Sequence, residues 1–332
     1  MRFQNPGKLR FWTPVSILAV GTLLIGGGMA ATNGETFATP EQAAKALVLA
    51  AQSDNRASAF KILGPSAKEF LVTTDPVADR NARQTFVAKA REKMRVVADP
   101  SRPSQRILEI GNDRWPFPIP IARTAAGRWH FDTLQGRRTV MLRRIGHNEL
   151  TALDLSRGYV EAQNEYFEKD RMGTGVRQYA QKFISSPDEK DGLFWKSTDP
   201  DDESPIAEFV GKAIAEGYTK RGEPYHGYFF KILKAQGPHA AGGAMDYMED
   251  GAMTKGFAMI AWPSGYRSTG VKTFLVDRSG IVYEKDLGPK TGEIANAMTV
   301  YDPDQTWSPV SGSGVPKPPE PVRTTMRHKI SH

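Results

Sequence analysis

The chain has 332 residues, of which 39% are hydrophobic and 24% are charged. This length and composition suit a globular protein with room for two domains of about 100 to 150 residues. The formal net charge of +7 lies mainly at the two ends, since residues 1–30 and 311–332 each carry +3 and leave +1 for residues 31–310. A nucleic-acid-binding protein concentrates positive charge on its folded surface, so this distribution argues against nucleic acid as a partner.

The first thirty residues have the pattern of a secretory signal peptide. Lys8 and Arg10 form a positive head, residues 12–25 carry no charge, and small residues precede a cleavage position after Ala30. The alternative is an uncleaved membrane anchor, because residues 11–33 are uncharged and long enough to span a bilayer. Either interpretation predicts that the folded part is exported to the periplasm or the cell exterior. A membrane contact is expected only through an uncleaved leader.

Residues 36–146 are predicted to form a domain of helices on a sheet. Thr39, Pro40 and Gln42 are typical of a helix start, and apolar residues follow at spacings of three and four. A second helix is predicted for residues 78–94. Short aromatic or β-branched runs separated by turn residues then predict strands over residues 106–111, 115–123 and 128–133. Alternating prolines in the middle run predict an edge or irregular strand.

The opening helix and the strand pair that ends in residues 127–132 (GRWHFD) resemble the cone-shaped α+β domains of the nuclear-transport-factor-like superfamily. Members of that superfamily often have a pocket between helix and sheet. The resemblance implies that Trp115, Phe117 and Trp129 line such a pocket and bind a ligand. The alternative is that these three side chains are ordinary core aromatics.

Residues 147–307 are predicted to form a second domain, in which Asn148 caps a long helix that runs to about residue 170 with a wide apolar face. A shorter helix follows and ends at Gly217. Four strands are predicted over residues 225–234, 256–262, 271–277 and 281–285, the last two joined as a hairpin. Residues 308–332 are predicted to be a disordered, proline-rich basic tail. The predicted fold class is therefore α+β, with two domains that each pack helices on an antiparallel β-sheet.

The order of long helix, variable loop and antiparallel meander resembles the globular head of type IV pilins and pseudopilins. The matching segments are residues 227–230 (GYFF), 257–263 (FAMIAWP) and the hairpin over 269–283. Pilins carry their membrane-spanning segment directly at the start of the long helix, whereas here a whole domain precedes Asn148. The resemblance therefore implies a pilin-like head that lacks the standard means of polymerising.

Over residues 36–305 the chain resembles a bacterial exported family, domain-of-unknown-function family 2950. The matching segments are residues 39–43 (TPEQA), 115–120 (WPFPIP), 144–150 (RIGHNEL) and the hairpin named above. This resemblance implies export and brings no activity with it.

Most catalytic arrangements are excluded by the residues present. The chain has no cysteine, so thiol nucleophiles, thiolate metal sites and disulfide bonds are absent. No His-Glu-x-x-His motif is available for zinc. Ser264 lacks the glycine two residues earlier that a nucleophile elbow requires. The sequence therefore predicts no cofactor and no metal.

Two weaker clusters remain. The first gathers at the start of a predicted strand and consists of Glu223, Tyr225, His226 and Tyr228. A histidine beside a carboxylate can act as a general base and the tyrosines can contact a ligand, but a hydrogen-bonded surface turn is the alternative. The second is an acidic loop that can supply carboxylates to Ca²⁺ or can simply be solvated, and it consists of Asp199, Asp201, Asp202 and Glu203.

These observations predict an exported cell-envelope protein that acts as a non-enzymatic binding or assembly module. Its partner would be an envelope protein or a small ligand. The alternative is an envelope hydrolase with a site centred on His226 and Glu223. An enzyme needs a concave pocket with converging polar groups, whereas an assembly module presents a flat apolar patch.

Overall fold

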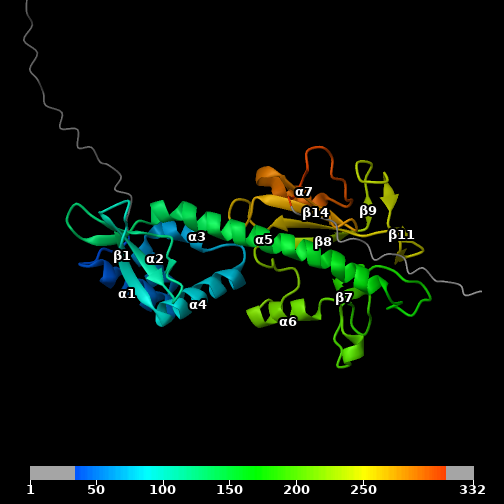
Figure 1. The fold of residues 1–332 in the computed structure, drawn as a ribbon, viewed down its shortest axis with the longest axis horizontal. Coiled ribbons are helices and arrows are strands. Elements are labelled where there is room, and N and C mark those ends of the chain that lie inside the picture. The colour runs from blue at the N-terminus through cyan, green and yellow to red at the C-terminus, as the bar shows by residue number, and fades with distance from the viewer. Residues whose placement is uncertain (1–33, 312–332) are drawn as a thin grey trace, which may run out of the picture. The chain divides into compact units, whose positions relative to one another are not determined.

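A computed structural model describes residues 34–311, so the predicted leader and most of the predicted tail lie outside the described residues. The described chain is α+β, as predicted, with helices packed on antiparallel sheets (Figure 1). None of the helices between residues 34 and 311 combines the length and the apolar composition that a bilayer crossing requires.

The first helix confirms the cap predicted from the sequence. Helix α1 spans Pro40–Gln52, and the Thr39 hydroxyl accepts a hydrogen bond from the Gln42 backbone N–H at 3.2 Å. The next helical elements are α2 (Arg56–Leu63), η1 (Pro65–Ala67), α3 (Lys68–Leu71) and α4 (Pro76–Glu92). Helix α4 matches the second predicted helix, residues 78–94, except that it starts and ends two residues earlier. The elements between α1 and α4 were not predicted, because they are only three to eight residues long and too short for a clear periodic pattern.

The first sheet has the strand order β1-β2-β4-β5, with β3 paired to β2, and all pairs are antiparallel. Its strands are β1 (Met94–Ala98), β2 (Gln105–Ile110), β3 (Trp115–Pro116), β4 (Ile121–Arg123) and β5 (Trp129–Phe131). Strand β1 was not predicted, and Met94 begins it rather than ending the preceding helix. The chain between β3 and β4 is irregular, which confirms the effect expected of the alternating prolines.

Helix α5 (Thr133–Phe167) corrects the prediction that a helix begins at Asn148 after a junction near residues 143–147. Its true N-cap is Asp132, which accepts a hydrogen bond from the Gln135 backbone N–H at 3.0 Å. Asn148 lies inside the helix, and its side chain donates a hydrogen bond to the Thr269 carbonyl at 2.8 Å. The polar residue that suggested a cap is therefore used for a tertiary contact.

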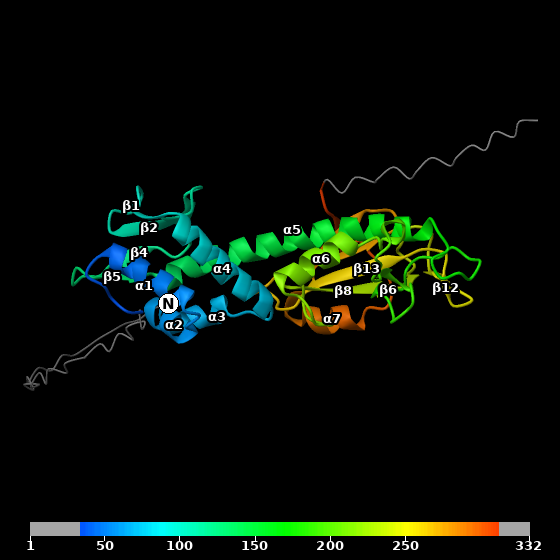
Figure 2. The same cartoon turned by 90° about the horizontal axis from the view of Figure 1, so that it is seen from below.

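The second sheet is an antiparallel meander with the order β16-β15-β14-β13-β8. Its strands are β8 (Tyr228–Leu233), β13 (Ala258–Pro263), β14 (Lys272–Asp277), β15 (Val282–Asp286) and β16 (Ser308–Pro309). All six residues of β13 are buried, as expected of a strand covered on both faces. Figure 2 shows α5 and α7 (Thr291–Ala297) on opposite sides of this sheet. Strand β16 corrects the start of the predicted tail, because pairing with β15 orders residues 308–309.

The remaining elements are short and lie mostly in the loops around the second sheet. They are β6 (Lys182–Ile184), β7 (Gly192–Phe194), η2 (Pro200–Asp202), α6 (Ala207–Glu216), β9 (Ala235–Gln236), β10 (Met245–Asp246), β11 (Met248–Glu249), β12 (Ala252–Met253) and η3 (Gly288–Lys290). Helix α6 ends where predicted, at Gly217, whose φ of 98° lies in the left-handed region that glycine favours.

Two hydrophobic cores lie within these residues. One surrounds the first sheet and includes Leu108, Ile121 and Phe131, whereas the other surrounds the meander and includes Ile260 and Phe274. Helix α5 supplies side chains to both cores, so the two halves share one continuous helix. Whether each half folds independently stays a prediction.

Candidate functional site

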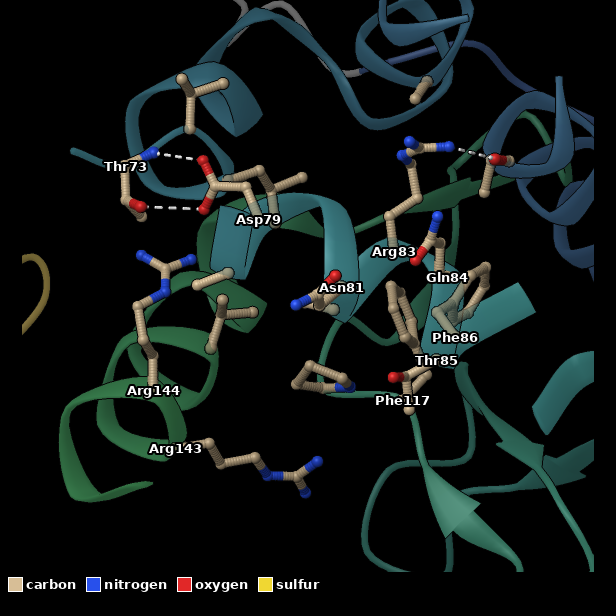
Figure 3. A pocket seen from close by; sticks show the side chains of 18 of the residues that line it. Thr73, Asp79, Asn81, Arg83, Gln84, Thr85, Phe86, Phe117, Arg143 and Arg144 are labelled. Carbon is tan, nitrogen blue, oxygen red and sulfur yellow. Dashed lines mark hydrogen bonds between the residues drawn. The ribbon is translucent and has the colours of Figure 1, made fainter. Parts of the chain in front are cut away.

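A cavity of about 1080 Å³ lies among α1, α2, α4 and α5 (Figure 3). Its volume is at the upper end of the range of about 300 to 1,000 Å³ that is typical of small-molecule sites. Much of the wall is apolar, and six large side chains in it are only partly buried by the protein: Phe60, Leu71, Phe86, Trp115, Phe117 and Val140.

Helix α4 explains why this wall is left open. Its apolar side chains fall into two groups. Val87 and Ala90 are buried, whereas Ala82 and Phe86 face the cavity. Helix α4 therefore carries apolar side chains that no other described element fully covers.

The structure separates the three aromatic residues that were predicted to line a pocket. Trp115 and Phe117 do line the cavity, and the Phe117 ring lies 5.1 Å from the Phe86 ring between centroids. Trp129 is buried in β5 away from this wall, with the Arg106 guanidinium 5.1 Å from its ring centroid. Two of the three therefore belong to the candidate site.

A buried carboxylate, which was not predicted, holds the start of α4 at the edge of the cavity. Asp75 is 1% exposed, and its Oδ1 accepts a hydrogen bond from the Ala78 backbone N–H at 2.9 Å. Its Oδ2 accepts hydrogen bonds from the Gly227 backbone N–H at 2.8 Å and from the Tyr218 hydroxyl at 3.0 Å. Asp75 thus ties α4 to the turn before β8. An Asp-Pro pair at a helix start is a cap signal of the same kind as Thr39-Pro40, so this residue could have been found from the sequence.

His226 lies in the wall of the same cavity, but Glu216 rather than the predicted Glu223 is its carboxylate partner. The distance from His226 Nε2 to Glu216 Oε2 is 2.9 Å, and the Tyr225 hydroxyl donates a hydrogen bond to the same oxygen at 3.1 Å. Glu223 instead forms an ion pair with Lys220 at 3.4 Å. Glu216 is the last residue of α6. The nearest sequence signal was Gly217, which predicted the end of the helix but not the contact with His226.

A second histidine stands beside this pair. The His147 ring centroid lies 5.8 Å from that of His226, and both residues line the cavity. Burial lowers the pKa of His147 and the neighbouring His226 lowers it further, whereas Glu216 acts in the opposite direction. The net shift favours the neutral form of His147.

The predicted tyrosines lie apart from the first cavity. Tyr225 and Tyr228 line a second cavity of about 1020 Å³ among α5, α6 and β8, together with Glu223. The Tyr228 hydroxyl donates a hydrogen bond to the Lys272 carbonyl at 2.9 Å, and burial raises its pKa. The first predicted cluster is thus divided between two cavities.

The acidic loop forms a turn around η2. Asp199 Oδ1 accepts a hydrogen bond from the Asp201 backbone N–H at 3.0 Å, and Asp202 forms an ion pair with Lys190 at 2.6 Å. That lysine lowers the pKa of the Asp202 carboxyl. Among residues 34–311, no three or more His, Cys, Asp or Glu side chains are arranged to hold a metal ion. This finding covers the acidic loop of Asp199, Asp201, Asp202 and Glu203.

The polar part of the cavity wall contains a carboxylate and two arginines that were not predicted. Asp79 accepts hydrogen bonds from the Thr73 backbone N–H at 2.8 Å and the Thr73 hydroxyl at 2.9 Å. Arg143 and Arg144 extend from α5 on the other side, as Figure 3 shows. Burial lowers the pKa of Arg144, whereas the charge of Asp79 raises it. The site therefore combines a broad apolar wall with charged groups at α5.

Comparison with known proteins gives a family but no structural relative. No curated protein and no solved structure matches the chain, so the pilin-like and nuclear-transport-factor-like resemblances gain no support. A family model matches residues 34–310, which include every element of both sheets. The chain belongs to the family described as "protein of unknown function (DUF2950)".

Proposed function

We propose that this protein is an exported, non-enzymatic binding module of the cell envelope that holds a small apolar molecule in the cavity among α1, α2, α4 and α5. The observation that carries the proposal is the cavity of about 1080 Å³ whose wall presents partly uncovered Phe60, Phe86 and Phe117. Removing apolar surface from water contributes roughly 25 cal/mol for each Å², so an apolar ligand would be stabilised there.

The concave site favours a small ligand over an assembly surface. Large exposed apolar side chains outside the cavity are spread over several elements: Leu49 lies on α1, Leu134, Leu142 and Leu150 lie eight residues apart on α5, and Ile214 lies on α6. Scattered single residues of this kind are normal on soluble proteins. Export is supported by the leader pattern of residues 1–30. We propose a nuclear-transport-factor-like first half because the cavity wall combines side chains of the helices with Ile110 of β2 and Trp115 of β3. The antiparallel meander supports a pilin-like second half in the same way.

We expect Ala82→Trp to reduce the binding of a neutral apolar probe by at least about tenfold, because an indole at this position would fill part of the cavity. The probe is N-phenyl-1-naphthylamine, whose fluorescence rises when it leaves water, and titration gives its dissociation constant. Ala82 is exposed on α4, so the substitution should leave the fold intact.

The matched control is Ala88→Trp, which adds the same side chain to an exposed position of α4 outside the cavity wall. This control should bind the probe as the unsubstituted protein does. Equal dissociation constants for the two tryptophan variants would show that the probe does not occupy this cavity.

A second candidate function is hydrolysis, and the contact of 2.9 Å between His226 and Glu216 in the cavity wall is the observation that favours it. A carboxylate that orients a histidine is an arrangement found in general-base sites. No serine is among the described residues that line the cavity with this pair. A histidine base would therefore have to activate water.

Replacing His226 with asparagine separates the two functions. Asparagine suits this position because His226 has a φ of 46°, in the left-handed region that asparagine tolerates. As a binding module, the variant should keep its affinity for the neutral probe, and neither protein should hydrolyse p-nitrophenyl butyrate above the buffer rate. Hydrolysis that falls by roughly 10² to 10⁴ in the variant, at an unchanged melting temperature, would instead establish the hydrolase.

A further inference from the structure

The charged side chains of the cavity wall, besides two histidines, are Arg56, Arg83, Lys89, Arg143 and Arg144 and the carboxylates of Asp75, Asp79 and Glu216. Two of its cations are already neutralised, since Arg83 pairs with Asp54 at 2.8 Å and Lys89 pairs with Asp113 at 2.7 Å. Arg143 and Arg144 have no carboxylate oxygen within 4.0 Å among residues 34–311. Arg56 on α2 also lines the cavity without an ion pair among the described residues, but Arg143 and Arg144 are adjacent on α5 and form a neighbouring pair of such cations.

The carboxylates of the wall have hydrogen-bond partners of their own. Asp75 accepts bonds from three groups, as described above, and Asp79 accepts two from Thr73. Glu216 contacts His226 and accepts a bond from Tyr225. None of the three lies within ion-pair distance of Arg143 or Arg144, although the charge of Asp79 acts on Arg144 and raises its pKa.

The surroundings of the two arginines leave donor groups free for a ligand. Arg143 Nη1 donates to the Pro116 carbonyl at 2.8 Å, and its guanidinium lies 4.9 Å from the centroid of the Trp115 ring. Arg144 donates to the Phe70 carbonyl, and its Nη1 makes a long contact of 3.5 Å with the Ser268 carbonyl. A guanidinium has five N–H donors, so each arginine retains donors beyond these contacts.

The apolar and the cationic parts of the wall adjoin each other. Trp115 is in contact with Arg143 and belongs to the same wall as Phe86 and Phe117. Figure 3 shows Phe86 and Phe117 together on one side of the cavity, with Arg143 and Arg144 on α5. One molecule with an apolar chain and a charged end could contact both parts.

We infer that the cavity takes an anionic amphiphile, with an acid group at Arg143 and Arg144 and an alkyl chain against Phe86 and Phe117. This inference rests on the proposed binding function. Guanidinium groups bind carboxylate and phosphate oxygens through charge-assisted hydrogen bonds. Either a fatty carboxylate or an alkyl phosphate has this chemistry, and the experiment separates the two.

The test measures how laurate, dodecyl phosphate and dodecanol displace N-phenyl-1-naphthylamine from the full-length exported protein at pH 7. All three have the same alkyl chain, so the comparison isolates the acid group. We expect at least one of the two anions to bind about tenfold or more tightly than dodecanol. The tighter of the two anions identifies the acid group that the site prefers.

Substitution of the arginines should remove this preference selectively. The double variant Arg143→Gln and Arg144→Gln should bind the preferred anion about tenfold more weakly and dodecanol within twofold of the original value. The matched control carries glutamine at Arg137 and Arg138, which lie on α5 outside the cavity wall. If loss of the Arg144 contacts unfolds the double variant, Arg143→Gln alone gives the same test, since Arg143 is exposed.

The outcomes separate the inference from the function on which it rests. Equal affinities for the anions and dodecanol, or a preference that survives in the arginine variants, would overturn the anionic ligand and leave an apolar binding module. If the neutral probe itself fails to bind, the proposed binding function fails too.

Discussion

Replacing Asp75 with alanine is expected to lower the free energy of unfolding by about 3 to 5 kcal/mol. The carboxylate is 1% exposed and accepts hydrogen bonds from Ala78, Tyr218 and Gly227. Its removal leaves the Gly227 N–H and the Tyr218 hydroxyl without their acceptor in a buried environment, and it also removes the N-cap of α4. Urea unfolding followed by circular dichroism measures the change.

Two further variants make the Asp75 result specific. Asp75→Asn keeps one carbonyl oxygen, so it should lose only part of the stability. Asp154→Ala removes a carboxylate whose side chain is 77% exposed, and it should change stability by less than about 1 kcal/mol. If Asp75→Ala lowers the free energy of unfolding no more than Asp154→Ala does, the contacts between α4 and the turn before β8 do not stabilise the native state. Because Asp75 lies beside the cavity, probe binding should weaken together with stability.

We expect Gln163→Leu to cost about 3 to 5 kcal/mol of stability within the core around the meander. The Gln163 side chain is 0% exposed and bridges the backbone of Ala180, donating to its carbonyl at 2.8 Å and accepting from its N–H at 2.8 Å. It also donates to the Tyr159 hydroxyl at 3.0 Å. Leucine fits a similar volume but leaves both backbone groups of Ala180 unpaired. Urea unfolding gives the size of the effect.

Hydrogen exchange measured by mass spectrometry on this variant also tests whether the halves fold separately. If they do, Gln163→Leu should accelerate exchange in β13 and β14 and leave the first sheet unchanged. Acceleration in both sheets would indicate a single cooperative unit joined by α5. The control is Gln52→Leu at the exposed end of α1, which should alter stability by less than about 0.5 kcal/mol.

Features that depend only on neighbouring residues could be predicted from the sequence. The cap formed by Thr39 and Gln42 marks α1, Gly217 ends α6, and residues 278–280 turn β14 into β15. Alternating prolines make the chain between β3 and β4 irregular. Caps, turns and prolines act through hydrogen bonds and backbone angles within a few residues, so their effects can be predicted without the fold.

The course of α5 depends on tertiary contacts and could not be predicted from the sequence. Gly136 lies inside α5 where a Cβ atom would be 2.7 Å from the Ile119 Cα, so the glycine allows close packing between the helix and residue 119. Asn148 suggests a cap, but its side chain bonds to Thr269, 121 residues away. The same residue types serve local and distant contacts, and the sequence does not distinguish the two uses.

The candidate site was also decided by the tertiary structure. His226 was predicted, yet its partner Glu216 depends on how α6 packs beside the turn before β8. Phe117 was predicted, yet it meets Arg143 and Arg144 in one wall only because α5 continues past the first sheet. A cavity forms where packed elements leave side chains uncovered, and that depends on contacts between residues far apart in the chain.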